Sequence, residues 1–160
     1  MLKKKVLFIC TYNSVRSQMA EGLLRAYYGD KFEVYSAGLY PSGVNSNAIK
    51  VMKEIGIDIS GQRSKVIDEF RTMKFDYCIS VCDQTKETCP FFPSAVNYIH
   101  KVFVDPGKFQ GEEREALNVF RRSRDEIKKW IEKIFKDAKR TNYPAKKEYR
   151  KTAERKKANI

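Results

Sequence analysis

The chain has 160 residues, of which 42% are hydrophobic and 32% are charged, and it carries a formal net charge of +12. This length and apolar content allow one globular domain with a buried core, and they argue against a chain that is disordered throughout. Ten Lys or Arg residues and three Asp or Glu residues lie between Lys136 and Ile160, so the positive charge belongs largely to the end of the chain. We therefore expect one folded domain over residues 1–136 and a basic C-terminal extension over residues 137–160.

No apolar run in the sequence approaches the ~20 residues that a membrane span requires. The first nine residues, MLKKKVLFI, imitate a signal peptide, but the apolar part is too short and no small-residue cleavage site follows it. We therefore expect a cytoplasmic protein in a reducing compartment. In that setting the four cysteines are better suited to redox chemistry or metal binding than to structural disulfides.

Hydrophobic periodicity predicts strands that alternate with helices along the chain. The expected strands cover residues 4–9, 33–37, 76–81 and 97–104. The expected helices cover residues 17–28, 45–55, 64–73 and 112–135, and residues 83–88 are polar and turn-like. This alternation predicts an α/β three-layer sandwich, in which a four-stranded parallel sheet carries helices on both faces.

Cys10 directly follows the first predicted strand, and the pattern Cys-x5-Arg leads into the first helix. The N-terminus of a helix presents backbone N–H groups and a partial positive charge, which bind anions and lower the pKa of a nearby thiol. The fork of an arginine suits a tetrahedral oxyanion. We predict that Cys10 is a nucleophile and that a phosphate-like oxyanion is bound by Thr11, Tyr12, Asn13, Ser14, Val15 and Arg16. The alternative is a buried, inert thiol, because Cys-x5-Arg also arises by chance.

Two further residues are predicted to lie beside this loop. Ligands of parallel α/β sheets bind beyond the carboxyl ends of the strands. Cys10 follows the first strand, Cys82 the third and Asp105 the fourth, so all three are expected at one edge of the sheet.

Several short motifs together resemble the arsenate reductases that share the low-molecular-weight protein tyrosine phosphatase fold. They are CTYNSVRSQMAEG at residues 10–22, SAG at 36–38, Asp-Pro at 105–106 and the segment 121–127, in the order of the family. Cys82 and Cys89-Pro90 match the paired redox cysteines of the thioredoxin-coupled branch. The resemblance covers roughly residues 4–135, which leaves only the basic extension outside it.

The resemblance implies that arsenate is reduced to arsenite and that thioredoxin recycles the enzyme. Asp105 would act as general acid, and Ser17 would donate a hydrogen bond to the sulfur of Cys10. Cys82 would attack the adduct of Cys10 with arsenic, and Cys89 would then pass the resulting disulfide outward to thioredoxin. The plainer alternatives are a turn aspartate at 105 and two cysteines without a redox role.

Two other functions stay open at this point. The first is a low-molecular-weight protein tyrosine phosphatase, although the tyrosines that this class usually has after Asp-Pro are replaced by Gly107, Lys108 and Phe109. The second is a non-catalytic oxyanion-binding or regulatory protein. Its best support is Tyr12, because the family usually has glycine there, and the side chain would either strain the loop or narrow the pocket.

No bound cofactor or metal is expected. In some reductases of this type a potassium ion lies near the loop, and Asn13, Glu21 and Ser36 match its ligands. The acidic fourth ligand falls on Lys65, whose ammonium could take the place of the cation, so potassium is doubtful. Metal binding by Cys78, Cys82 and Cys89 is a weak alternative, because no Cys-x-x-Cys or histidine partner accompanies them.

The expected partners are an arsenate-like or phosphate-like oxyanion and thioredoxin. The basic extension carries no recognised nucleic-acid-binding motif, so nucleic acid is an unlikely partner. We expect a monomer that does not bind membranes.

Overall fold

The computed structural model describes residues 2–82 and 95–136. Four parallel strands form one sheet in the order β2-β1-β3-β4. The strands are β1 (Lys4–Cys10), β2 (Phe32–Gly38), β3 (Tyr77–Ser80) and β4 (Asn97–His100). The parallel sheet predicted from the sequence is therefore confirmed. The expected turn at 83–88, Cys89 and the basic extension over 137–160 lie outside the described residues.

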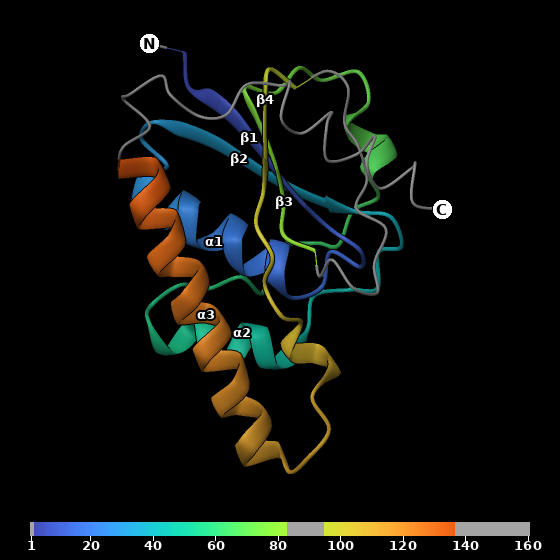
Figure 1. The fold of residues 1–160 in the computed structure, drawn as a ribbon, viewed down its shortest axis with the longest axis vertical. Helices are drawn as coiled ribbons and strands as arrows, with labels where there is room; N and C mark the ends of the chain where they lie inside the picture. The colour runs from blue at the N-terminus through green and yellow to red at the C-terminus, as the bar shows by residue number, and fades with distance from the viewer. Residues whose placement is uncertain (1, 83–94, 137–160) are drawn as a thin grey trace.

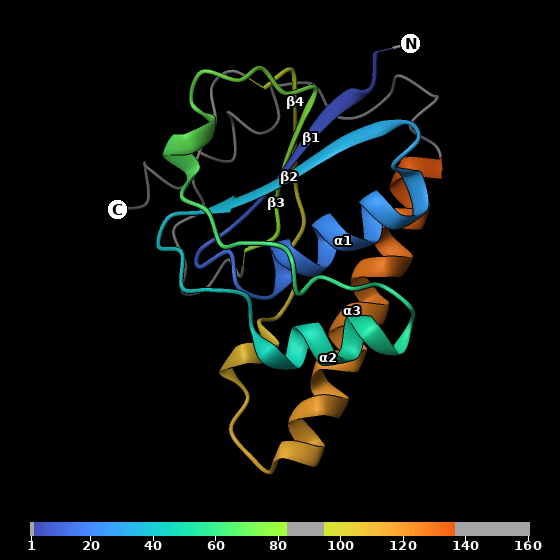
Figure 2. The same ribbon diagram turned by 180° about the vertical axis from the view of Figure 1, so that it is seen from behind.

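The two faces of the sheet are covered differently. The helices α1 (Arg16–Tyr28), α2 (Ser46–Glu54) and α3 (Glu113–Lys136) share one apolar core with one face of the sheet. The opposite face packs against the short 3₁₀ helix η1 (Ile67–Phe70) and the aromatic residues around it. Figures 1 and 2 show α1 to α3 on one side of the strands and η1, in green, on the other. The predicted α/β architecture with both faces covered is thus present.

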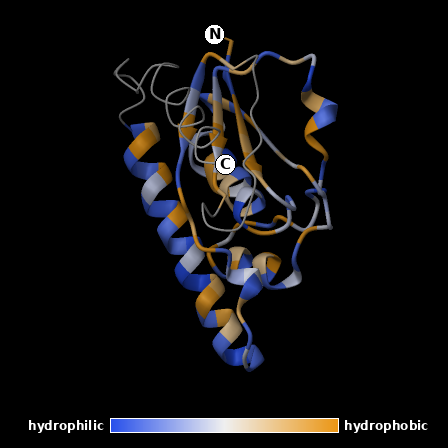
Figure 3. Ribbon diagram, turned by 45° about the vertical axis from the view of Figure 1, so that its right-hand side comes forward, coloured by the Kyte–Doolittle hydropathy of each residue, from blue (hydrophilic) through white to orange (hydrophobic). Residues whose placement is uncertain are grey.

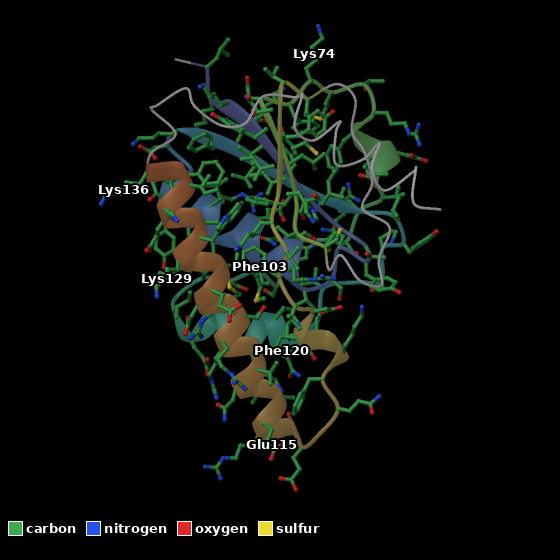
Figure 4. The ribbon with its side chains drawn as sticks, viewed as in Figure 1. Lys74, Phe103, Glu115, Phe120, Lys129 and Lys136 are labelled. Atoms are coloured by element: carbon green, nitrogen blue, oxygen red, sulfur yellow. The ribbon has the colours of Figure 1, made fainter. Side chains whose placement is uncertain are left out.

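Helix α3 closes the larger core with a single apolar stripe. Its colours alternate between hydrophobic and hydrophilic along its length in Figure 3. The stripe includes Phe120, Ile127 and Ile131, all buried. Phe103 lies between the strands and α3 (Figure 4), and its ring centroid is 5.8 Å from that of Trp130. Trp130 therefore belongs to the core, as its helical spacing predicts. In the described part of the chain, no helix is long and apolar enough to cross a bilayer.

The helix predicted over 64–73 is wrong for most of its length. Only Ile67–Phe70 is helical, as the 3₁₀ turn η1. The preceding residues are drawn into the sheet edge, because Val66 bridges Gly38 and the carbonyl of Lys65 accepts from the N–H of Gly38 at 2.8 Å. Tertiary pairing thus overrides the local apolar pattern.

The fourth strand ends earlier than predicted, at His100 rather than at residue 104. Its neighbour β3 ends at Ser80, and the N–H of Lys101 donates to the carbonyl of Ser80 at 2.9 Å. Beyond that contact β3 offers no further residues with which residues 101–104 could pair. Asp105 therefore follows a four-residue connection, and it begins the short 3₁₀ helix η2 (Pro106–Lys108).

Candidate active site

Cys10 is the last residue of β1, and its side chain is buried at 2% exposure. Its Sγ lies 2.7 Å from Oγ of Ser17, which is in the first turn of α1. The backbone N–H of Asn13 also donates to Sγ, at 3.2 Å. The strand, the loop and the helix start therefore converge on the sulfur. Both contacts hold the sulfur at the point where the loop turns into α1.

Residues 11–15 connect β1 to α1, and the backbone N–H of Asn13 within them points at the sulfur of Cys10. We call residues 11–16 the anion loop, after the role predicted for them. In the part of the chain that the structure describes, no side chain caps the start of α1. The first N–H groups of a helix commonly bind an anion when no side chain satisfies them. Asn13 adopts a positive φ of 47°, a conformation that asparagine tolerates better than most residues.

Tyr12 does not carry the strain that its replacement of glycine suggested. The left-handed conformation falls on Asn13 instead, and Tyr12 is 44% exposed. Its carbonyl accepts from the N–H of Ser42 and from the hydroxyl of Ser64, both at 3.1 Å. The backbone of Tyr12 is thus held on two sides while its ring reaches solvent.

Gly38, at the end of β2, lies directly against the anion loop. A Cβ at this position would lie 2.8 Å from N of Asn13 and 2.8 Å from O of Thr11. Both are backbone atoms of the loop, which cannot move aside as a flexible side chain can. The SAG motif therefore ends in glycine because the loop approaches too closely for any side chain.

The side chain of Arg16 connects three parts of the sheet edge. It is 2% exposed, and its Nη1 lies 3.4 Å from the carbonyl of Val81 and 3.2 Å from that of Phe103. Its Nη2 lies 3.5 Å from Oδ2 of Asp105. Arg16 thus connects the start of α1 with the segment after β3 and with Asp105, at the sheet edge where Cys10, Cys82 and Asp105 were predicted to meet.

Asp105 has two partners that use different oxygen atoms. Oδ1 accepts from the N–H of Gly107 at 2.9 Å and caps η2, while Oδ2 faces Arg16. Asp105 can therefore cap the turn with one oxygen while the other oxygen faces the proposed site, so the two interpretations of this residue do not exclude each other. The carboxylate is oriented by the cap and remains at the edge of the site.

Cys82 lies against the end of β1. It is fully buried, and its Sγ is 3.8 Å from the carbonyl of Ile9, the residue before Cys10. Cys78 lies elsewhere, in the apolar cluster on the opposite face of the sheet, where burial raises the pKa of its thiol. The structure shows Cys10, Cys78 and Cys82 as thiols rather than as disulfides. Among the described residues, no group of three or more His, Cys, Asp or Glu could hold a metal ion.

The residues matched to potassium ligands contain a lysine. Oγ of Ser36 lies 3.3 Å from Oε2 of Glu21, and Nζ of Lys65 lies 3.9 Å from Oε1 of the same carboxylate. Nζ also donates to the carbonyl of Arg63 at 2.7 Å. Burial lowers the pKa of Lys65, although the nearby Glu21 opposes this effect. A buried ammonium at this position does not fit a potassium site.

Asn13 organises the underside of the loop through direct hydrogen bonds, including bonds to Ser36 and Lys65, with which the resemblance had grouped it around a cation. Its Oδ1 accepts from Nε2 of Gln18 at 2.9 Å and from the backbone N–H of Lys65 at 2.8 Å. Its Nδ2 donates to Ser17 at 2.8 Å and to Ser36 at 2.9 Å. The partners Lys65 and Ser36 are remote in sequence, so no local pattern could identify them.

The chain is similar to proteins of a known family. Residues 5–143 match the family model described as low molecular weight phosphotyrosine protein phosphatase. An arsenate reductase from Halalkalibacterium halodurans is 50% identical over 131 residues, which are 82% of this chain and 94% of that protein.

Two solved structures are informative about the site. An arsenate reductase in the phosphate binding state is 36% identical, with a TM-score of 0.65, over 82% of this chain and 95% of the other. A thioredoxin-dependent arsenate reductase from Corynebacterium glutamicum is 28% identical, with a TM-score of 0.55, over 81% of this chain and 62% of the other.

Proposed function

The chain belongs to the low molecular weight phosphotyrosine protein phosphatase family, and from this premise we propose that it reduces arsenate to arsenite and is recycled by thioredoxin. One observation carries the proposal. Two buried thiols lie at the end of β1: Cys10 within the anion loop, and Cys82, whose Sγ is 3.8 Å from the carbonyl of Ile9. A phosphatase has no use for the second thiol, whereas reduction needs two electrons in addition to oxyanion binding.

In the first step the thiolate of Cys10 attacks arsenic. A bond forms between sulfur and arsenic, and one oxygen of arsenate leaves as water after Asp105 supplies a proton. Backbone N–H groups of residues 11–16 and the guanidinium of Arg16 hold the remaining oxygens. Ser17 stabilises the thiolate before attack through its contact with Sγ of Cys10.

In the second step the thiolate of Cys82 attacks the sulfur of Cys10. A Cys10–Cys82 disulfide forms, the bond between sulfur and arsenic breaks, and its electron pair stays on arsenic, which becomes As(III) and leaves as arsenite. Cys89 then attacks Cys82 and frees Cys10, and the Cys82–Cys89 disulfide is reduced by thioredoxin. Cys89 lies outside the described residues, so its part follows from its match to the family motif.

Phosphatase activity is the second candidate, because the anion loop suits phosphate as well as arsenate. The phosphate binding state of a related reductase supports this view. We expect only a residual activity toward aryl phosphates, since Gly107 and Lys108 follow Asp105 where this class usually has tyrosines. The non-catalytic alternative loses one of its two supports, because Tyr12 does not strain the loop with a left-handed backbone.

The remaining assignments belong to the same proposal. The folded domain covers residues 1–136, residues 137–160 form a basic extension, and the protein acts as a monomer in the cytoplasm, where reduced thioredoxin is present. The ammonium of Lys65 supplies positive charge beside Glu21, in place of a potassium ion.

The proposal is tested by following arsenate-dependent oxidation of NADPH with thioredoxin and thioredoxin reductase. We expect turnover in the wild type and none in the Cys82→Ser variant, with Cys78→Ser as a matched control that retains turnover. Unaltered turnover in Cys82→Ser would refute the disulfide relay. Efficient hydrolysis of an aryl phosphate without arsenate reduction would favour the phosphatase.

A further inference from the structure

A chain of side-chain hydrogen bonds connects the surface of α1 to the sulfur of Cys10. It begins at Arg25, whose side chain is 49% exposed, and passes through Gln62, Gln18, Asn13 and Ser17. The loop that follows α2 runs alongside the start of α1 in Figure 2, and it brings Gln62 to Gln18. The successive donor–acceptor distances are 3.1, 2.8, 2.9, 2.8 and 2.7 Å.

The outer half of this chain has only one possible direction. A guanidinium donates and cannot accept, so Nη1 of Arg25 must face the carbonyl oxygen of Gln62. The NH₂ group of Gln62 is then left to donate to Oε1 of Gln18. Since Oε1 of Gln18 is thereby the acceptor, the NH₂ group of Gln18 is the one that turns toward Asn13.

The inner half has the same direction, and here Gln18 shares the orientation of Asn13 with a second donor. The backbone N–H of Lys65 donates to Oδ1 of Asn13, and Nε2 of Gln18 donates to the same oxygen. The NH₂ group of Asn13 must therefore face the hydroxyl oxygen of Ser17. With that oxygen accepting, the hydroxyl hydrogen of Ser17 is directed to Sγ of Cys10.

We propose that Gln18 and Gln62 are positioning residues that, together with the backbone N–H of Lys65, orient the hydrogen bond from Ser17 to the Cys10 thiolate. Gln18, Asn13 and Ser17 are each fully buried, so water cannot readily reverse the chain. A thiolate accepts hydrogen bonds and cannot donate them, so only this direction stabilises it. The consequence for arsenate turnover rests on the proposed function, whereas the effect on Cys10 does not.

The test compares three glutamine-to-methionine substitutions, which keep side-chain length and remove hydrogen bonding. Gln18→Met and Gln62→Met break the chain, and Gln110→Met changes an exposed glutamine outside it. For each protein, carbamidomethylation of Cys10 by iodoacetamide is measured from pH 5 to 10, with the modified peptide quantified by mass spectrometry. Thermal unfolding is recorded in parallel.

We expect the midpoint of the Cys10 profile to rise by about one pH unit in Gln18→Met, which is about a tenfold loss of rate on the acid side. Gln62→Met should shift it in the same direction by less, and Gln110→Met should leave it unchanged. In the arsenate assay, kcat of Gln18→Met should fall at neutral pH and recover at higher pH, with KM little changed. Mere loosening of the loop would raise KM without that recovery.

An unchanged midpoint in folded Gln18→Met would overturn the proposal. If Gln18→Met does not fold, Gln62→Met decides, because Gln62 is only partly buried in a loop. An upward shift in that variant supports the chain, and no shift overturns it. Because alkylation needs no arsenate, a wild type that fails to reduce arsenate would refute the proposed function while leaving this measurement valid.

Discussion

Nη2 of Arg16 lies 3.5 Å from Oδ2 of Asp105, and both side chains are buried at the carboxyl edge of the sheet. The guanidinium also reaches the carbonyls of Val81 and Phe103, so it is held by two chain segments that arrive from different strands. Arg16 is proposed to hold the oxyanion, and Asp105 is proposed to protonate the departing oxygen. Because the two side chains are in contact, the position of each depends on the other. Displacing either one is expected to disturb the other.

Replacing Arg16 with lysine should lower kcat for arsenate by about 10²–10³, because a lysine is a point charge and cannot reproduce the fork of donors toward the oxyanion. The measurement is arsenate-dependent NADPH oxidation at saturating thioredoxin. Arg121→Lys is the control, since Arg121 pairs with Glu54 on the surface. Equal activity in the two variants would mean that Arg16 only connects chain segments and does not hold the oxyanion.

Asp105→Asn should lower kcat by about 10²–10⁴, which is the usual contribution of a general acid. An asparagine oxygen can still accept from the N–H of Gly107, so the cap of η2 and the fold should survive. Thermal unfolding checks the fold, and arsenate turnover checks the chemistry. Full turnover in a stable Asp105→Asn protein would leave Asp105 with its capping role alone.

Gly38→Ala should destabilise the protein by about 1–3 kcal/mol and weaken oxyanion binding, because the added Cβ meets backbone atoms of the anion loop. Gly61→Ala is a suitable control, since a Cβ there has nothing within 4 Å. Urea unfolding gives the free energy of unfolding. Inhibition of arsenate reduction by phosphate gives the affinity of the loop for phosphate. Unchanged phosphate inhibition in Gly38→Ala would show that the loop accommodates the methyl group.

The features that depend on short stretches of sequence were predicted correctly. Cys10 at a strand end, Arg16 at a helix start and the parallel sheet all follow from short patterns of apolar and polar residues. The same reasoning failed at residues 64–73, where pairing of Val66 with Gly38 replaces a helix. Local propensity is a weak prior when a distant strand supplies hydrogen bonds.

The contacts beneath the loop were not predictable from the sequence. Gln18 and Gln62 are 44 residues apart, and the resemblance did not single out either of them. A glutamine in a helix and a glutamine in a loop carry no signal that they will meet, because each is an ordinary surface residue by composition. Only the fold reveals that both amides are buried or partly buried and point in one direction.

Lys65 provides a prediction about the dependence of stability on pH. Burial lowers its pKa from 10.5, and the nearby Glu21 only partly offsets this effect. Between the lowered value and 10.5 the unfolded chain binds more protons than the folded one, so this residue makes the free energy of unfolding rise with pH. Lys65→Met lacks that contribution. The stability of the wild type relative to Lys65→Met should therefore increase as pH rises toward 10.5.

The measurement is urea unfolding of both proteins at pH 8, 9 and 10, in potassium chloride and again in sodium chloride. Other titrating groups are common to the two chains and largely cancel in the difference. A difference that shrinks as pH rises would mean that the attraction of Glu21 outweighs burial. The wild type should also unfold and turn over arsenate equally in the two salts, because the ammonium of Lys65 already lies beside Glu21. A clear gain in potassium would show that the cation binds despite Lys65.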